Sequence, residues 1–159
     1  MTLRLMPLLA AALICGSAIA DKPAPDFTLK TLNGPNLRLG EQRGQVVMIN
    51  FWASWCGPCK QEMPHLNRLH DKYGDAGFKL LGVNIDDDPK KASAAAAALG
   101  VKFPVLLDAA KDVSRLYGLS AMPTTFVIDR DGRVRYVHKG YREGVENAYE
   151  QQVRALVKE

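Results

Sequence analysis

The sequence predicts an α/β fold in which a mixed central β-sheet is flanked by helices, with an N-terminal β-hairpin and a central βα insert. A nearly continuous apolar run at 46–52 leads directly into a segment whose apolar residues have helical spacing, at 57–73. A second strand and helix follow at 78–85 and 89–99, which is the alternation of a βαβ unit. Two strands around an Asp-Gly turn and a terminal amphipathic helix then complete an α/β order.

The first 20 residues are predicted to be a signal peptide. Arg4 supplies a positive charge, an apolar run follows, and residues 17–20 (Ser-Ala-Ile-Ala) have the A-x-A form of a cleavage site. The run is shorter than the ~20 residues that a membrane-spanning helix needs. The alternatives are an uncleaved membrane anchor and lipidation at Cys15, although the bulky Ile14 before it does not fit a lipoprotein site. We therefore expect export to the periplasm.

The rest of the chain is expected to be a polar, Pro-containing linker at 21–25 and one domain at 26–159. Of all residues, 47% are hydrophobic and 24% charged, which is ordinary for a globular domain. The formal net charge of +4 is small and scattered along the sequence. No nucleic-acid partner is indicated, because such proteins concentrate positive charge in a stripe or patch.

The domain is expected to begin with the hairpin. Residues 26–32 alternate between apolar and polar, Asn33-Gly34 is a strong turn signal, and 37–39 return as a second short strand. The strand at 46–52 is apolar at nearly every position, which is typical of a central strand covered on both faces. Pro64 lies inside the helix at 57–73 and predicts a kink.

The second half of the domain contains clear start and stop signals. Asp88 as N-cap and Pro89 as first helical residue open an alanine-rich helix, which Gly100 stops. The remaining predicted elements are a short strand within 101–107, a short helix at 112–117, strands at 124–129 and 134–138, and a helix at 143–157.

The chemistry is concentrated in Trp55-Cys56-Gly57-Pro58-Cys59. A buried strand that runs into a helix places Cys56 at the helix N-terminus, where free backbone N–H groups and the macrodipole favour a thiolate. Cys59 lies three residues further on the same helix face and can close on Cys56. So small a loop stabilises a domain little, so the pair is interpreted as a cycling dithiol rather than as a structural disulfide.

These features, together with Met122-Pro123-Thr124-Thr125, give a chain that resembles the thioredoxin superfamily, and more closely its exported TlpA/ResA-type thiol–disulfide oxidoreductases. The resemblance spans residues 24–157, and the strand and helix between 78 and 107 match the insert of that group. The other matching stretches are Ala24-Pro25-Asp26-Phe27, the lead-in 50–55, Glu62-Met63-Pro64 and 103–108.

The resemblance implies roles for the residues of the site. Cys56 would be the attacking thiol, exposed at the helix start, and Cys59 the resolving thiol behind it. Trp55 is interpreted as part of a flat apolar surface around Cys56, because aromatic anchors are over-represented in binding patches. Gly57 and Pro58 would form the active-site turn, and Pro58 would stiffen this turn and tune the reduction potential of the couple.

The resemblance also assigns a role to Met122-Pro123. The bond between them would be cis and packed beside the cysteines, although cis is the minority state for X-Pro bonds and a trans proline that starts a strand is the alternative. The Met122 backbone would then be free to pair with an extended substrate peptide.

Asn50 departs from plain thioredoxins, which carry a buried aspartate at this position. Asparagine cannot ionise, so Asn50 can only form hydrogen bonds. ResA-like proteins place an acidic residue in the insert instead, and Asp87 is the matching position here, with Asp86 just before it. We therefore hypothesise that Asp87 or Asp86 is a proton relay. The alternative, which the residues slightly favour, is that 86–88 is a solvated, helix-capping acidic run.

The predicted function is that of a periplasmic thiol–disulfide oxidoreductase that reduces disulfides of substrate proteins and needs no cofactor. Gly-Pro between the cysteines resembles reducing thioredoxins, whereas strongly oxidising periplasmic relatives carry Pro-His. The resemblance implies that a membrane thiol-reducing electron donor recharges the protein, and that its clients are cysteines of apocytochrome c or of copper sites.

Two other functions remain possible on the sequence. The dithiol could carry a soft metal such as Cu(I), although the chain lacks a methionine-rich or histidine-rich tract. A peroxidase would need a Thr-x-x-Cys site, which is missing around Cys56. No metal site is predicted, because one C-x-x-C pair cannot supply the four ligands of structural zinc and His65, His70 and His138 show no ligand spacing.

Overall fold

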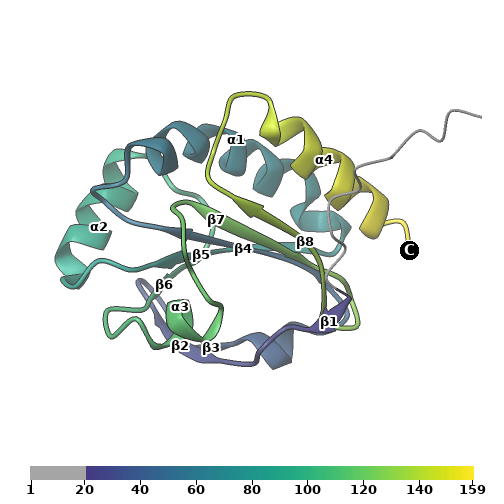
Figure 1. The fold of residues 1–159 in the computed structure, drawn as a ribbon, viewed down its shortest axis with the longest axis horizontal. Helices are drawn as coiled ribbons and strands as arrows, with labels where there is room; N and C mark the ends of the chain where they lie inside the picture. The colour runs from purple at the N-terminus through teal and green to yellow at the C-terminus, as the bar shows by residue number, and fades with distance from the viewer. Residues whose placement is uncertain (1–20) are drawn as a thin grey trace, which may run out of the picture.

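A mixed sheet of eight strands, in the order β1-β8-β7-β4-β5-β6-β2-β3, forms the centre of the computed structural model (Figure 1). The structure describes residues 21–159, and the predicted signal peptide lies outside the described residues. The strands are β1 Lys22–Pro23, β2 Thr28–Thr31, β3 Leu37–Arg38, β4 Val46–Trp52, β5 Phe78–Asn84, β6 Val105–Leu107, β7 Thr124–Ile128 and β8 Arg133–Lys139. The helices are α1 Gly57–Tyr73, α2 Pro89–Ala98, α3 Asp112–Leu116 and α4 Val145–Leu156, with 3-10 turns η1 Leu39–Gln42 and η2 Gly74–Ala76.

Strand β4 is the central strand, as predicted. It runs parallel to β5 and antiparallel to β7, and all seven of its residues are buried. Helices α1 and α4 cover one face of the sheet and α3 lies on the opposite side, toward which the edge strands β2 and β3 also curve (Figure 1). Because side chains alternate along a strand, neighbouring residues of β4 serve different layers. Asn50 bonds to Glu62 of α1, and Phe51 packs against Tyr117 after α3.

An aromatic cluster holds the layer opposite α1 and α4 together. Phe27, Phe51 and Phe126 surround Tyr117, with ring centroids 5.0–5.8 Å from the Tyr117 ring at tilted or edge-on angles. The Tyr117 hydroxyl donates to the carbonyl of Pro25 at 2.7 Å. Chain segments that are far apart in sequence are thereby joined below the sheet.

The segment expected to be a linker, 21–25, includes an edge strand. Lys22 and Pro23 pair with Val134 and Arg133 of β8, and Ala24 N donates to the carbonyl of Gly132 at 2.9 Å. This pairing depends on a strand more than 100 residues away, so local composition did not reveal it.

The predicted start of the alanine-rich helix is confirmed. The Asp88 carboxylate accepts from Lys90 N at 2.9 Å and caps α2, with Pro89 at the first helical position. Helix α1 continues without a break through Pro64, where the kink remains a prediction.

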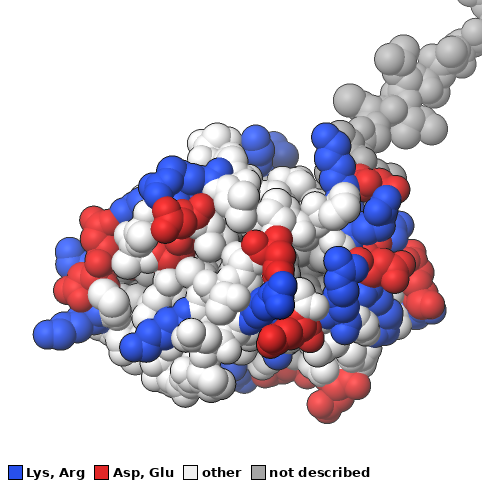
Figure 2. All heavy atoms as spheres, turned by 90° about the horizontal axis from the view of Figure 1, so that it is seen from below, with Lys and Arg blue, Asp and Glu red and all other residues white. Residues whose placement is uncertain are grey.

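None of the helices within 21–159 is long and apolar enough to cross a membrane. On the face seen from below, basic and acidic side chains are interspersed (Figure 2).

Gly82 in β5 is expected to tolerate no side chain. A Cβ atom there would lie 2.8 Å from Phe103 Cε2 and 3.1 Å from Trp52 Nε1, both in buried residues. We predict that Gly82→Ala lowers the free energy of unfolding by about 1–3 kcal/mol, as overpacking of a filled core does. Urea unfolding would measure it.

Gly74→Ala is the matched control. Gly74 has helical backbone angles and nothing within 4 Å of an added Cβ, so this variant should be neutral or more stable by up to about 1 kcal/mol. Equal losses in the two variants would contradict the packing argument.

Candidate active site

Cys56 and Cys59 form a disulfide at the N-terminus of α1, with their Cα atoms 5.3 Å apart. Cys56 is the N-cap residue, and its sulfur accepts from the backbone N–H of Cys59 at 3.2 Å. The sulfur therefore occupies the place where a capping side-chain oxygen usually sits, facing the positive end of a 17-residue helix. In the reduced protein the same donor and the helix dipole stabilise a thiolate on Cys56.

Both cysteines are buried in the disulfide form, Cys59 fully and Cys56 with 4% exposed. The prediction that Cys56 lies exposed is therefore wrong for the oxidised state, in which neighbouring residues largely cover it. Trp55 is 65% exposed, in contrast to the fully buried Trp52. Gly57 and Pro58 of the turn also lie at the surface, so Trp55 and this turn form the accessible rim around Cys56.

The Met122–Pro123 bond is cis, as the resemblance implied. Phe51 of β4 pairs with Thr124 of β7, so Pro123 lies at the same end of the sheet as the start of α1. Pro123 is buried and Met122 is half-buried. Within residues 21–159 the Met122 backbone has no hydrogen-bond partner, which is the condition for pairing with an extended peptide.

Asp86 and Asp87 are adjacent in sequence, but their surroundings differ. Asp86 is buried and accepts from Ser54 N at 2.9 Å, from Ser54 Oγ at 2.6 Å and from Asn84 Nδ2 at 2.8 Å. It therefore fixes the loop that leads into the cysteines.

Asp87 does not have the setting of a proton relay. Its side chain is 84% exposed and pairs with Lys111, and this lysine lowers the pKa of Asp87 below its usual value. Asp87 is thus ionised and solvated at neutral pH. The relay predicted at Asp87 is not supported, because its side chain points to solvent. The alternative, a solvated acidic run at 86–88, fits Asp87 but is wrong for the buried Asp86.

The acidic residue buried behind the cysteines is Glu62, which the sequence analysis did not single out. It lies on α1, three residues after Cys59, and is fully buried. Its Oε2 accepts from Asn50 Nδ2 at 2.9 Å, and its Oε1 accepts from the Tyr149 hydroxyl at 2.7 Å. One signal was available: Glu62 interrupts the apolar stripe that Cys59, Met63 and Leu66 form on the buried face of the helix.

Burial raises the pKa of Glu62 to about 7, against the opposing effect of the hydrogen bonds from Tyr149 and Asn50. Asn50 itself is fully buried and donates a second hydrogen bond to Thr125 Oγ1 at 2.9 Å. Glu62 is therefore a carboxyl that can gain or lose a proton near neutral pH, one helical turn from the buried thiol.

The fold and this site together define a thioredoxin-like thiol–disulfide oxidoreductase: a mixed sheet, a C-x-x-C disulfide at a helix N-terminus and a cis-proline at the same end of the sheet. The chain belongs to the redoxin family, whose model matches residues 19–153.

Proteins of similar sequence and structure carry related descriptions. The chain is 39% identical over 117 residues to the thiol-disulfide oxidoreductase ResA of Geobacillus thermodenitrificans, covering 74% of this chain and 67% of that protein. It is 38% identical over 120 residues to the thioredoxin-like protein YneN of Bacillus subtilis, covering 74% and 69%. A crystal structure from Chlorobium tepidum, described as a thiol:disulfide interchange protein DsbE, superposes with a TM-score of 0.84 at 38% identity, covering 89% of this chain and 99% of that one.

The raised pKa of Glu62 predicts a pH-dependent stability. An unfolded glutamate has a pKa of 4.5, so between ~4.5 and about 7 the folded protein binds more protons than the unfolded one, and stability falls as pH rises. We expect wild type to lose about 2–3 kcal/mol of unfolding free energy between pH 5 and pH 8 relative to Glu62→Gln. Urea unfolding of both oxidised proteins at the two pH values would measure this, and parallel changes would contradict it.

Proposed function

We propose that this thiol–disulfide oxidoreductase acts in the periplasm as a reductant of client-protein disulfides. The observation that carries the chemistry is the position of Cys56, which caps α1 beside the exposed Trp55 while Cys59 stays buried behind it. A thiolate at this position is stabilised without being removed from reach of a partner.

The reaction uses one pair of electrons and two bond exchanges. The Cys56 thiolate attacks one sulfur of a client disulfide, which forms a mixed disulfide and releases the other client sulfur as a thiolate. Cys59, once deprotonated, attacks the Cys56 sulfur, and the second client sulfur leaves. The client gains two thiols, and the Cys56–Cys59 disulfide seen in the structure is formed.

Glu62 is the group proposed to exchange the proton of Cys59. A buried thiol has no direct route to water, and the Glu62 carboxyl lies one helical turn away on the same buried face. With a pKa of about 7, Glu62 is close to the value at which a group both accepts and returns protons efficiently. We propose Glu62 for this role in place of Asp87, the proton relay hypothesised from the sequence.

The Met122 backbone is proposed to hold the client. Its free N–H and C=O groups lie beside the cis-proline and can form a short β-pairing with an extended segment of the client. The exposed Trp55 ring adds an apolar contact beside Cys56.

Export is supported by the leader-like sequence at 1–20, and reduction by the Gly57-Pro58 pair that resembles reducing thioredoxins. A reductant in an oxidising compartment must be recharged, which calls for a membrane thiol-reducing donor. Cysteines of apocytochrome c and of copper sites are the proposed clients, because their function requires free thiols in that compartment.

The direction of electron flow predicts the potential of the couple. Equilibration of the protein in thiol/disulfide buffers at pH 7, followed by tryptophan fluorescence, should give a value near or below about −230 mV. A value near about −120 mV, that of a strong oxidant, would reverse the proposed direction. Absence of a reversible couple, with Cu(I) retained by the reduced protein, would favour the metal carrier instead.

Client capture should depend on which cysteine is replaced. Cys59→Ser should accumulate mixed disulfides through Cys56, which adjoins the exposed Trp55 and Gly57, because the resolving thiol is missing. Cys56→Ser should form almost none, because Cys59 has no exposed surface. Non-reducing gels and mass spectrometry of extracts would compare the two variants. Equal yields would contradict the assignment of the attacking thiol.

The proton-exchange role predicts a difference between the two acidic residues. Glu62→Gln should slow release of client from the mixed disulfide by about a hundredfold and remove the rise in rate through pH 7. Asp87→Asn should leave both unchanged, because Asp87 is exposed and paired with Lys111. Stopped-flow measurement of the release step would test this, and the reverse result would restore Asp87 as the relay.

A further inference from the structure

The two oxygens of Glu62 have partners of different kinds. Asn50 Nδ2 donates to Oε2, and the Tyr149 hydroxyl donates to Oε1. We infer that Asn50 and Tyr149 are positioning residues that keep the Glu62 carboxyl in one place in both protonation states, Asn50 as a permanent donor and Tyr149 by reversing its hydroxyl. This inference rests on the proposed role of Glu62 and extends it to a strand and a helix that carry no cysteine.

The orientation of the Asn50 amide is fixed from two sides. One N–H of Nδ2 bonds to Glu62 Oε2 and the other to Thr125 Oγ1, both at 2.9 Å. An amide N–H can only donate, and it bonds equally to a carboxylate oxygen and to the carbonyl oxygen of a protonated carboxyl. Asn50 therefore keeps its hydrogen bond whenever the proton of Glu62 resides on Oε1.

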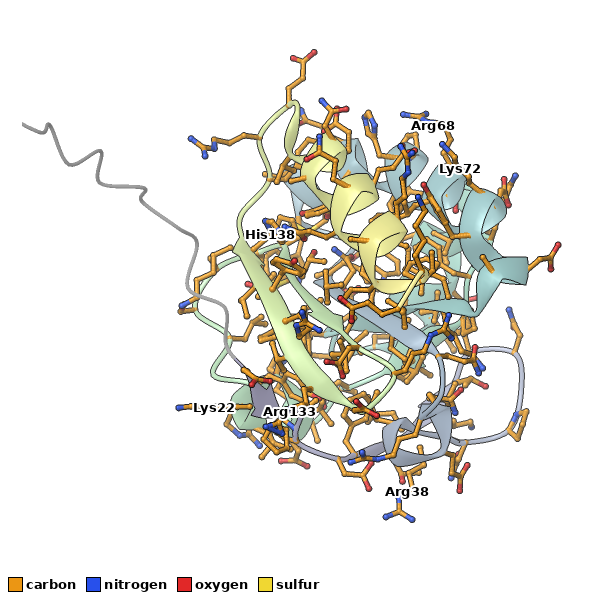
Figure 3. All side chains as sticks on the ribbon, turned by 90° about the vertical axis from the view of Figure 1, so that its right-hand side faces the viewer. Lys22, Arg38, Arg68, Lys72, Arg133 and His138 are labelled. Atoms are coloured by element: carbon orange, nitrogen blue, oxygen red, sulfur yellow. A yellow bond between two sulfur atoms is a disulfide. The ribbon has the colours of Figure 1, made fainter. Side chains whose placement is uncertain are left out.

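The Tyr149 hydroxyl is the partner that can change direction. It donates to Oε1 of the carboxylate at 2.7 Å, and once Oε1 carries a proton, the phenol oxygen can accept instead. Burial holds the pKa of Tyr149 well above its usual value, so the hydroxyl stays protonated throughout the working range. The Tyr149 ring is itself held by His138, whose ring lies edge-on at 4.9 Å and whose Nε2 contacts Gln152 Oε1. His138 lies on β8 and is labelled in Figure 3.

An aspartate at position 50 would not serve this purpose. Its ionised carboxylate cannot donate, and it would place a second negative charge next to Glu62 in a buried site. A neutral donor stabilises the ionised form of Glu62 without competing for its proton. The amide at position 50 and the carboxyl at position 62 thus form one unit.

Several titratable groups surround this unit and belong in any interpretation of its pH dependence. Glu146 on α4 raises the pKa of Glu62 by charge repulsion, and it is itself 3.7 Å from His65 on α1. The Tyr141 hydroxyl contacts Glu146, and His138 on β8 packs against Tyr149. Asn50 of β4 and Thr125 of β7 contribute no charge.

The test is an NMR pH titration of the full chain with 13C-labelled glutamate and tyrosine and 15N-labelled asparagine. In wild type, the Tyr149 Cζ and Asn50 Nδ2 resonances should move with the same midpoint as the Glu62 carboxyl, near pH 7. In Tyr149→Phe the Glu62 midpoint should rise by about one unit, because a charged acceptor loses a donor. Asn50→Ala should also raise it.

Tyr73→Phe is the matched control. It also removes a tyrosine hydroxyl that lies between α1 and α4, but the Tyr73 partner, Glu150, is a surface carboxylate that also pairs with Lys72. It should leave the Glu62 midpoint where it is in wild type. The wild-type titration needs no variant, so it decides the question even where Asn50→Ala fails to fold.

The inference is overturned if Tyr149 and Asn50 do not respond to the Glu62 titration, or if Tyr149→Phe shifts Glu62 no more than Tyr73→Phe does. A different outcome would contradict the proposed proton exchange while leaving this inference intact. If Tyr149→Phe moves the Glu62 midpoint while the pH dependence of client release stays where it is in wild type, the positioning role stands and Glu62 is not the proton partner of Cys59.

Discussion

The active site depends on the junction between a fully buried strand and a helix N-terminus. Strand β4 is covered on both faces, and its end fixes where α1 begins and which way its first N–H groups point. The sulfur of Cys56 takes the capping position and accepts from Cys59 N, so the interaction that starts the helix also stabilises the reactive thiolate. Asp86, in the loop after the neighbouring strand β5, strengthens the junction by accepting from the Ser54 backbone N–H and hydroxyl.

The same junction creates a problem for proton transfer, because the second thiol is buried with no exposed surface. Glu62 provides a buried carboxyl that can take up and return this proton. A buried carboxylate without partners would cost several kcal/mol, and the two hydrogen bonds from Asn50 and Tyr149 offset part of that cost. The part of the desolvation cost that these hydrogen bonds do not offset raises the pKa of Glu62 to about 7. Proton exchange near neutral pH requires a pKa in this range.

Local sequence patterns predicted most of the fold, because strand β4, helix α1 and the Asp88-Pro89 helix start are determined by neighbouring residues. The cis bond at Pro123 came from the resemblance, since composition alone favours trans. The missed features depend on distant partners: β1 pairs with β8, and Glu62 bonds to Tyr149, 87 residues away. Asp86 and Asp87 could not be told apart, because the loop after β5, not the residue type, decides which side chain turns inward.

Two buried carboxyl groups serve this site, and their partners and positions explain why they do different things. Asp86 accepts from three donors, the backbone N–H and the hydroxyl of Ser54 and the side-chain amide of Asn84, and so acts as an anchor for the loop before the cysteines. Glu62 accepts from the Asn50 amide and the Tyr149 hydroxyl, and it lies on α1 one helical turn after Cys59, within reach of the buried thiol's side of the helix. Once Glu62 carries a proton, the Tyr149 hydroxyl can accept from it without movement of the backbone. The capacity to exchange a proton therefore lies in the choice of hydroxyl on α4 as much as in the carboxyl on α1.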